Sequence, residues 1–204
     1  MLLILIPFIK PFFKVNKFNV TKVGVTNIGN GRGPRHMTLI PERSLAIVVC
    51  ELQNYVQLHK LDAKSSNLTM MQEMNVVSVD KNAGAEVLVH PNKQWIYISS
   101  RLIQILKVKF CILPFRGVGL VAVFHLDDKE KLTKVQEFKL NGTWPRSMAM
   151  SPEGDMLIVA DQMGDSLHVL KISQEDGTLT VVVGGIITTP HQPSYVTFVK
   201  EPFL

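Results

Sequence analysis

One repeated pattern limits the fold of this chain more than any other feature of its sequence. The stretches PRHMTLIPERSLAIVVCE, AEVLVHPNKQWIYISSR and PRSMAMSPEGDMLIVADQ begin at Pro34, Ala85 and Pro145. Each contains a short strand-like run, a proline with polar neighbours, and an apolar run that ends on a polar residue. A shorter copy, PSYVTFV, begins at Pro193. The chain is therefore built from repeated units.

Each full copy is followed by two more alternating runs joined by a polar turn, such as YVQLHKLDAKSSNLTMMQEM. Four short strands in a unit of roughly 40 to 50 residues are typical of a β-propeller blade. The strands are not separated by convincing helical periodicity, which argues against α/β folds. We therefore expect an all-β propeller of four-stranded antiparallel blades. Its first strands are predicted near residues 35–40, 85–90, 146–151 and 194–199.

The spacing of the repeat predicts how the chain is divided. Four positions are equivalent, at intervals of 50, 61 and 48 residues: His36, Glu86, Ser147 and Tyr195. The long interval contains an apolar and basic segment, residues 102–116, that fits no strand of the unit. The apolar residues 1–14 do not fit either, so residues 15–204 are predicted to form the propeller. The chain supplies about four blades, and the last of them is cut off after its first strand. Propellers close with roughly 4 to 8 complete blades, so the predicted ring is incomplete.

Composition excludes several classes of function. Nine of the 22 lysines and arginines lie in residues 1–35 and 102–116, so the repeats themselves are acidic, and nucleic acid is not an expected partner. Cys50 and Cys111 form no disulfide or metal pattern. The N-terminal apolar run lacks the features of a signal peptide and is too short to span a bilayer. We expect a cytoplasmic protein with no membrane partner, no metal and no cofactor.

The repeat also predicts a polar site at one end of the blades. The start of a first strand and the end of the second lie at the same sheet edge. The residues expected there are Arg35, His36, Glu86 and Arg146 on first strands, and Glu51, Arg101 and Gln162 after second strands. The first strands line the channel of a propeller, so these side chains are expected to meet at its mouth.

Acid–base chemistry on an anionic substrate suits this set. Histidine is the side chain that most readily takes up or gives up a proton near neutral pH, so His36 could deprotonate water, and Glu86 or Glu51 could orient it or act as the base. The arginines offer forked donors for a carboxylate, a phosphate or an oxyanion. Structural roles in loop hydrogen bonds and ion pairs are the alternative for Arg35, His36 and Glu51. The other strand histidines are expected on the solvated surface, namely His59, His125 and His168.

The segments GPRHM, AEVLVHPNKQWIYISSR with GVGLVAVFHLD, and WPRSMAMSPEGDMLIVADQMGDSLHVLKI resemble the seven-bladed propeller lactonases. That family includes bacterial-type 6-phosphogluconolactonases and fungal carboxy-cis,cis-muconate cyclases. The resemblance implies a seven-bladed ring and metal-free hydrolysis of a lactone in carbohydrate metabolism, in the pentose phosphate pathway. It also implies that the catalytic residues are His36, Glu86, Arg101 and Arg146. From their places in the repeat, Arg35, Glu51 and Gln162 are expected to bind the substrate.

Two hypotheses of different classes follow. The first is a 6-phosphogluconolactonase-like hydrolase that acts on a small anionic lactone, or a muconate cyclase that runs the reverse closure. The second is a propeller without catalysis that binds partners on its rim. A scaffold does not need His, Glu and Arg at one channel mouth, which favours the enzyme. The oligomeric state stays open.

Overall fold

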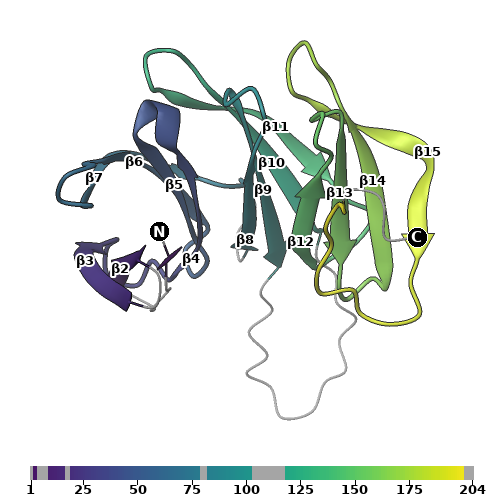
Figure 1. Ribbon diagram of the computed structural model, residues 1–204. Helices are drawn as coiled ribbons and strands as arrows, with labels where there is room; N and C mark the ends of the chain where they lie inside the picture. The colour runs from purple at the N-terminus through teal and green to yellow at the C-terminus, as the bar shows by residue number, and fades with distance from the viewer. Residues whose placement is uncertain (1, 4–8, 17–18, 79–81, 103–117, 200–204) are drawn as a thin grey trace.

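The computed structural model describes residues 2–3, 9–16, 19–78, 82–102 and 118–199, which form β-sheet almost throughout. Three four-stranded antiparallel sheets follow one another along the chain, and the strands of each sheet are neighbours in sequence order (Figure 1). This connectivity is an up-and-down meander. The predicted all-β fold, an incomplete propeller of four-stranded antiparallel blades, is confirmed.

We name these sheets blades 1, 2 and 3. Blade 1 contains β4 (Pro34–Ile40), β5 (Leu45–Cys50), β6 (Tyr55–Leu61) and β7 (Leu68–Asn75). Blade 2 contains β8 (Asn82–Val89), β9 (Trp95–Leu102), β10 (Leu120–Leu126) and β11 (Leu132–Lys139). Blade 3 contains β12 (Pro145–Met150), β13 (Met156–Asp161), β14 (Ser166–Ile172) and β15 (Leu179–Thr188). Before blade 1 lies an antiparallel sheet of β1 (Leu2–Leu3), β2 (Ile9–Asn16) and β3 (Asn19–Asn27), and the 3-10 turn η1 (Pro41–Arg43) joins β4 to β5.

The turn after the first strand of each blade combines a proline with a residue in the left-handed backbone region. Ser44, Lys93 and Gly154 have φ angles of 52°, 63° and 76° in these turns. Proline restricts its own φ, and the left-handed residue then reverses the chain into the second strand. At Gly154 a Cβ would also lie 2.3 Å from Nε2 of His90 in blade 2. The proline turn of the repeat is thus a tight hairpin connection.

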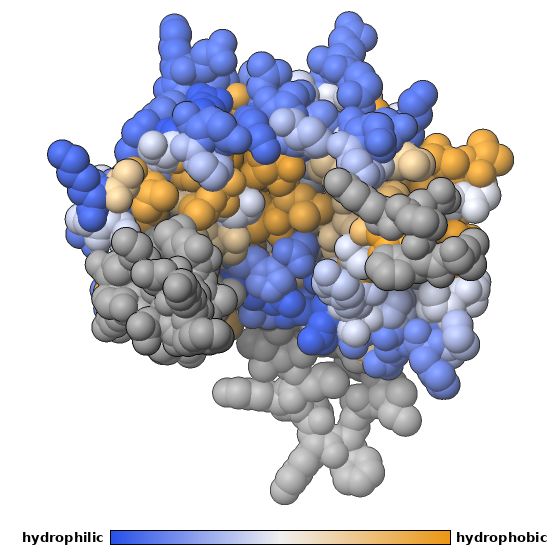
Figure 2. Space-filling view, in the orientation of Figure 1, coloured by the Kyte–Doolittle hydropathy of each residue, from blue (hydrophilic) through white to orange (hydrophobic). Residues whose placement is uncertain are grey.

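The hydrophobic core lies between the blades. One cluster of buried side chains fills the space between blades 1 and 2, and a second fills the space between blades 2 and 3. Within β9, Ile96 and Ile98 belong to the first cluster and Tyr97 to the second, as the two-residue alternation of a strand requires. The inner strand β8 contacts β4 on one side and β12 on the other. In the view of Figure 2 an apolar band crosses the middle of the molecule between hydrophilic ends.

Glutamines of the outer strands fasten each blade to the next. Gln72 of β7 donates to the carbonyl oxygen of Leu132 at 2.7 Å and accepts from its backbone N–H at 2.9 Å. Gln136 of β11 makes the same two bonds to Leu179, at 3.1 and 2.7 Å. Each glutamine lies four residues after the Leu that starts its strand. The equivalent position of blade 3 is Val183, which is fully exposed.

The fourth copy of the repeat does not form the expected strand. Residues 194–199 have no strand assignment, although the backbone N–H of Val196 lies 3.4 Å from Oγ of Ser147 on β12. A strand needs a ladder of backbone hydrogen bonds, and none of the described strands pairs with this segment. The prediction of a first strand at 194–199 is therefore wrong. The described residues contain three four-stranded blades.

Two histidines that were expected on the surface are buried. His59 on β6 and His168 on β14 are 2% and 3% exposed, and His125 on β10 is half-buried against the ring of Trp95. The third strand of a blade has a strand on each side and a blade face above it, so its polar side chains need internal partners. Nε2 of His59 accordingly lies 2.9 Å from Oε1 of Gln57. The surface prediction is wrong for His59 and His168.

The predicted domain boundaries stay predictions. Of residues 102–116 only Leu102 is described, as the last residue of β9, and the rest lie outside the described residues. The strand β2 crosses the boundary that was placed after residue 14, and it pairs with β3.

Candidate active site

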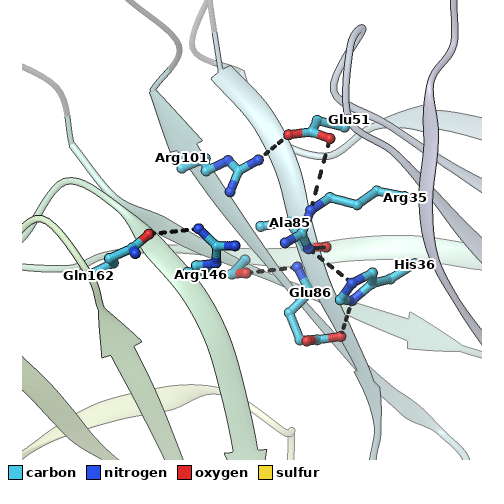
Figure 3. Close-up of polar contacts among 9 residues, drawn as sticks. Arg35, His36, Glu51, Ala85, Glu86, Arg101, Arg146 and Gln162 are labelled. Atoms are coloured by element: carbon cyan, nitrogen blue, oxygen red, sulfur yellow. Dashed lines mark hydrogen bonds and ion pairs between the residues drawn. The ribbon is translucent and has the colours of Figure 1, made fainter. Parts of the chain in front are cut away.

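A β-bulge occurs at the start of the first strand in all three blades. The pairing of β4 with β5 skips Arg35, and the pairing of β12 with β13 skips Arg146. In blade 2 the irregularity lies between Gly84 and Val87 and includes Glu86. A bulged residue leaves the alternation of the strand and turns its side chain elsewhere. The bulges gather polar side chains from all three blades at one end of the inner strands (Figure 3).

His36 and Glu86 form a contact between blades 1 and 2. Nδ1 of His36 lies 2.5 Å from a carboxylate oxygen of Glu86. Nη1 of Arg35 lies 3.3 Å from Nε2 of the same imidazole. Because a guanidinium only donates, Nε2 is the accepting nitrogen of neutral His36, and Nδ1–H donates to Glu86. The carboxylate therefore holds the tautomer in which Nε2 can take up a proton.

Arg35 connects this pair to the rest of the site. Its Nη1 donates to the carbonyl oxygen of Ala85 at 2.5 Å, and its Nε lies 3.9 Å from the carboxylate of Glu51. Burial and the nearby charge of Arg101 lower the pKa of Arg35, while Glu51 and Glu86 act in the opposite direction. Arginine keeps its proton in proteins, so Arg35 is a cation with limited solvation.

Arg101, at the end of β9, is the most buried cation of the site. Its guanidinium donates to Glu51 and stacks on the ring of Trp144 with 5.0 Å between its carbon and the ring centroid. The side chain is 10% exposed, and its Nε has no hydrogen-bond partner among the described residues. An unpartnered buried donor costs free energy, so the buried position of Arg101 is not explained by its own hydrogen bonds alone.

Arg146 and Gln162 form a separate pair in blade 3. Nη1 of Arg146 donates to Oε1 of Gln162 at 3.0 Å, and the arginine is exposed. Five predicted site residues thus share one connected cluster, namely Arg35, His36, Glu51, Glu86 and Arg101. Among the described residues, Arg146 has no hydrogen bond or ion pair to this cluster, and its charge acts on Arg35 as repulsion that lowers the pKa of Arg35. The roles of all seven residues stay predictions.

The site carries excess positive charge. Its three guanidinium groups face only two carboxylates, those of Glu51 and Glu86. Glu51 lies beside Arg35 and Arg101, whereas Arg146 contacts a neutral amide. Among the described residues, the guanidinium without an acidic partner is therefore that of Arg146, and an anionic ligand would balance its charge.

A pocket of about 430 Å³ adjoins Glu86 on the side of blade 3. Leu88 of β8, Met148 and Met150 of β12, and Phe198 supply most of its apolar lining. Glu86 thus lies between the imidazole of His36 and an apolar pocket.

Sequence reasoning missed three residues that shape this site. Oγ of Ser99 accepts from the backbone N–H of Glu86 at 3.0 Å and so supports the bulge of blade 2. Trp144 precedes the Pro-Arg pair of blade 3 and stacks on Arg101. The buried Asp161 accepts from the loop that carries Trp144. Trp144 could have been noticed, because it directly precedes one of the repeated Pro-Arg pairs.

Among the described residues, no group of three or more His, Cys, Asp and Glu side chains is placed to hold a metal ion. The same residues contain no helix long and apolar enough to cross a membrane.

Known proteins share this architecture. A 6-phosphogluconolactonase of Blochmanniella pennsylvanica is 25% identical over 83% of this chain and 48% of its own length. One from Pectobacterium carotovorum is 27% identical over 73% of this chain and 41% of its own length. A solved Lactobacillus plantarum protein has a TM-score of 0.81 at 20% identity, over 94% of this chain and 52% of that one. The chain spans about half the length of the curated relatives it matches.

The family model described as lactonase, 7-bladed beta-propeller matches residues 12–198. This range includes all three blades and every residue of the site. The chain therefore belongs to the seven-bladed β-propeller lactonase family.

Proposed function

We propose that this protein is a lactone hydrolase of the 6-phosphogluconolactonase type. The observation that carries the proposal is the contact of His36 with Glu86 beside three arginines at one end of the inner strands. The names of the curated relatives support it. The chain spans about half the length of those relatives. The proposal therefore assigns roles only to residues of blades 1 to 3.

In the proposed reaction His36 is the general base. Nη1 of Arg35 leaves Nε2 of His36 for the lactone carbonyl oxygen, and Nε2 then takes a proton from water as the water oxygen bonds to the carbonyl carbon. Glu86 stabilises the imidazolium that forms. Arg35 and Arg101 donate to the oxyanion of the tetrahedral intermediate. The bond between the carbonyl carbon and the ring oxygen then breaks, and His36 returns its proton to that oxygen. The product is a hydroxycarboxylate.

Arg146 is proposed to bind the anionic group of the substrate. It is exposed, its only hydrogen-bonded partner among the described residues is neutral Gln162, and the site has one positive charge in excess. A phosphate or carboxylate accepts two parallel bonds from a guanidinium. Gln162 holds the guanidinium in place at 3.0 Å.

A muconate cyclase is the second proposed activity. In this reaction one carboxylate oxygen of the muconate adds to a carbon–carbon double bond, and protonated His36 would give its proton to the adjacent carbon, so that no water enters or leaves. Arg146 would bind another carboxylate of the substrate instead of a phosphate. Assays with phosphorylated and carboxylated substrates separate the two. We also propose a role in the pentose phosphate pathway, as the names of the curated relatives suggest. A cytoplasmic location, expected from the sequence, is part of the same proposal.

The experiment compares hydrolysis of 6-phosphoglucono-δ-lactone and uncharged glucono-δ-lactone by the protein and its variants, corrected for spontaneous hydrolysis. His36→Ala is expected to lower the rate of enzymatic hydrolysis by about 10² to 10⁴-fold, the usual contribution of a general base. Arg146→Ala is expected to lower kcat/KM about 10- to 100-fold for the phosphorylated lactone, with a smaller effect on the uncharged one.

His191→Ala is the matched control, because His191 is exposed and lies outside the site. It should retain full activity, and the melting temperature of each variant should stay near that of the parent. If the protein hydrolyses neither lactone, or if His36→Ala keeps full activity, the proposed function is wrong.

A further inference from the structure

A buried carboxylate fastens the loop that leads into blade 3. Asp161, the last residue of β13, has no solvent exposure. One carboxylate oxygen accepts from the backbone N–H of Thr143 at 3.1 Å, and the other accepts from that of Trp144 at 2.7 Å. These bonds and the neighbouring His168 hold the pKa of Asp161 below its ordinary value, against the opposing effect of burial. The carboxylate is thus a fixed acceptor for two successive amides.

The surroundings of Asp161 leave it little freedom. Nε2 of His168 lies 3.9 Å from its Oδ2, and Oγ of Ser166 lies 3.3 Å from the same imidazole nitrogen. A Cβ on Gly142 would fall 1.8 Å from Oδ2, and one on Gly164 would fall 2.1 Å from it. Both backbone segments therefore approach the carboxylate more closely than any other residue type allows.

The fastened loop carries a residue of the site. The indole of Trp144 stacks on the guanidinium of Arg101, whose opposite contact is the carboxylate of Glu51. The carbonyl oxygen of Trp144 also accepts from the backbone N–H of Gln162 at 3.1 Å, directly after Asp161. The backbone N–H of Trp144 is thus bound by the carboxylate of Asp161, and its carbonyl oxygen by the backbone N–H of Gln162, just after β13.

This arrangement belongs to blade 3 alone among the three blades. The equivalent of Asp161 is Cys50 in blade 1 and Ser100 in blade 2. Those blades form without a carboxylate at this position, so the fold of a blade does not require one. The acid occurs in the blade whose entry loop places an aromatic ring on Arg101.

We propose that Asp161 is a positioning residue that holds Trp144 over Arg101, and that the indole fixes the orientation of this guanidinium for the ligand. Stacking on the ring and pairing with Glu51 restrict the orientation of the Arg101 guanidinium. The proposal rests on the proposed function in one respect, namely that Arg101 binds the substrate or its oxyanion.

Fluorescence tests the positioning directly. The chain has two tryptophans, so Trp95→Phe leaves Trp144 as the only emitter. In this background, Asp161→Ala is expected to shift the emission to longer wavelength and to raise acrylamide quenching severalfold, because the loop gains solvent. Asp161→Asn keeps one acceptor oxygen and should give an intermediate value. The affinity for 6-phosphogluconate, measured by calorimetry in the same variants, should fall in the same order.

Two further variants keep the test decisive. Ser100→Ala changes the equivalent position in blade 2 and should leave the emission of Trp144 unchanged. If Asp161→Ala fails to fold, Gly142→Ala displaces the loop while it keeps every charge, and the same shift is expected. Unchanged emission and quenching in a folded Asp161→Ala or Gly142→Ala variant would overturn the proposal.

The test of Asp161 can fail or succeed independently of the test of lactone hydrolysis. If the parent protein hydrolyses no lactone, the proposed function fails, and the fluorescence result still decides whether Asp161 positions Trp144. If the parent is active, Asp161→Asn is expected to raise KM for the phosphorylated lactone more than it lowers kcat. A fall in melting temperature with unchanged KM and unchanged emission would show a purely structural role and would contradict the proposal.

Discussion

Blades 1 and 3 present equivalent faces in different surroundings. Blade 2 packs against one face of blade 1. No described blade packs against the equivalent face of blade 3. The matched positions on the covered face have no exposure, namely Ile47, Val56 and Leu58. Their equivalents on the open face are half-buried, namely Ile158, Leu167 and Val169. All four strands nevertheless form in both blades.

Two kinds of interaction hold the blades together, and they act in different places. Backbone hydrogen bonds lie within a blade, so the sheet forms whether or not a neighbour is present. Burial of apolar side chains lies between blades, and it supplies most of the stabilisation. Blade 3 therefore has the structure of a propeller blade, but one of its faces contributes less to stability.

The largest expected effect is on the matched isoleucines. Ile47→Ala leaves a cavity between blades 1 and 2 and is expected to lower the free energy of unfolding by about 3 to 4 kcal/mol. Ile158→Ala at the equivalent position should cost about 1 kcal/mol, because the side chain is already partly hydrated. Urea denaturation of the two variants measures both values. Equal losses would mean that the open face is covered in solution.

The next effect concerns acid stability. Burial lowers the pKa of His59 from 6.5 to about 4, so the folded state resists its protonation. The free energy of unfolding should be constant above pH 6.5 and should fall by roughly 3 kcal/mol between pH 6.5 and pH 4 from this group. Blade 3 has Leu170 at this position. His59→Leu should therefore remove this part of the pH dependence in denaturation measured from pH 4 to 8, and an unchanged slope would contradict the assignment.

The smallest effect concerns the glutamine contacts. Gln136→Ala leaves the backbone groups of Leu179 without their partner and is expected to cost about 1 to 2 kcal/mol in urea denaturation. Val183→Gln introduces the same side chain on blade 3, where no described blade lies opposite. It should leave stability within about 0.5 kcal/mol of the parent. A clear gain would show that a partner covers this strand.

Much of this structure could be predicted from the repeat. Strand alternation and the proline turns are local signals, and the two-strand geometry of a hairpin places His36 and Glu86 at the same end of neighbouring blades. The burial of His59 could not be predicted, because it depends on what packs against the face of blade 1 that points away from blade 2 and not on the strand pattern. The role of Asp161 was hidden because a polar residue after an apolar run only signals the end of a strand.

The bulges were equally beyond sequence reasoning, because they are a property of pairing register. Pro34 and Pro145 mark the strand starts, but no sequence signal shows that the residue after each proline lacks an opposing partner. Figure 3 also shows Arg146 paired with Gln162 and not with His36, a placement that depends on how blade 3 packs against blade 2 and that the repeat does not encode.

The bulged residues have a consequence for how this protein can change. Arg35, Glu86 and Arg146 lie at irregularities of strand pairing, outside the alternation that directs the residues after them to one face of the blade or the other. A substitution at these three positions therefore changes the polar groups at this end of the blades without moving an apolar side chain from one core to another. Under the proposed function, such substitutions would change which ligand binds while the packing between the blades stays the same.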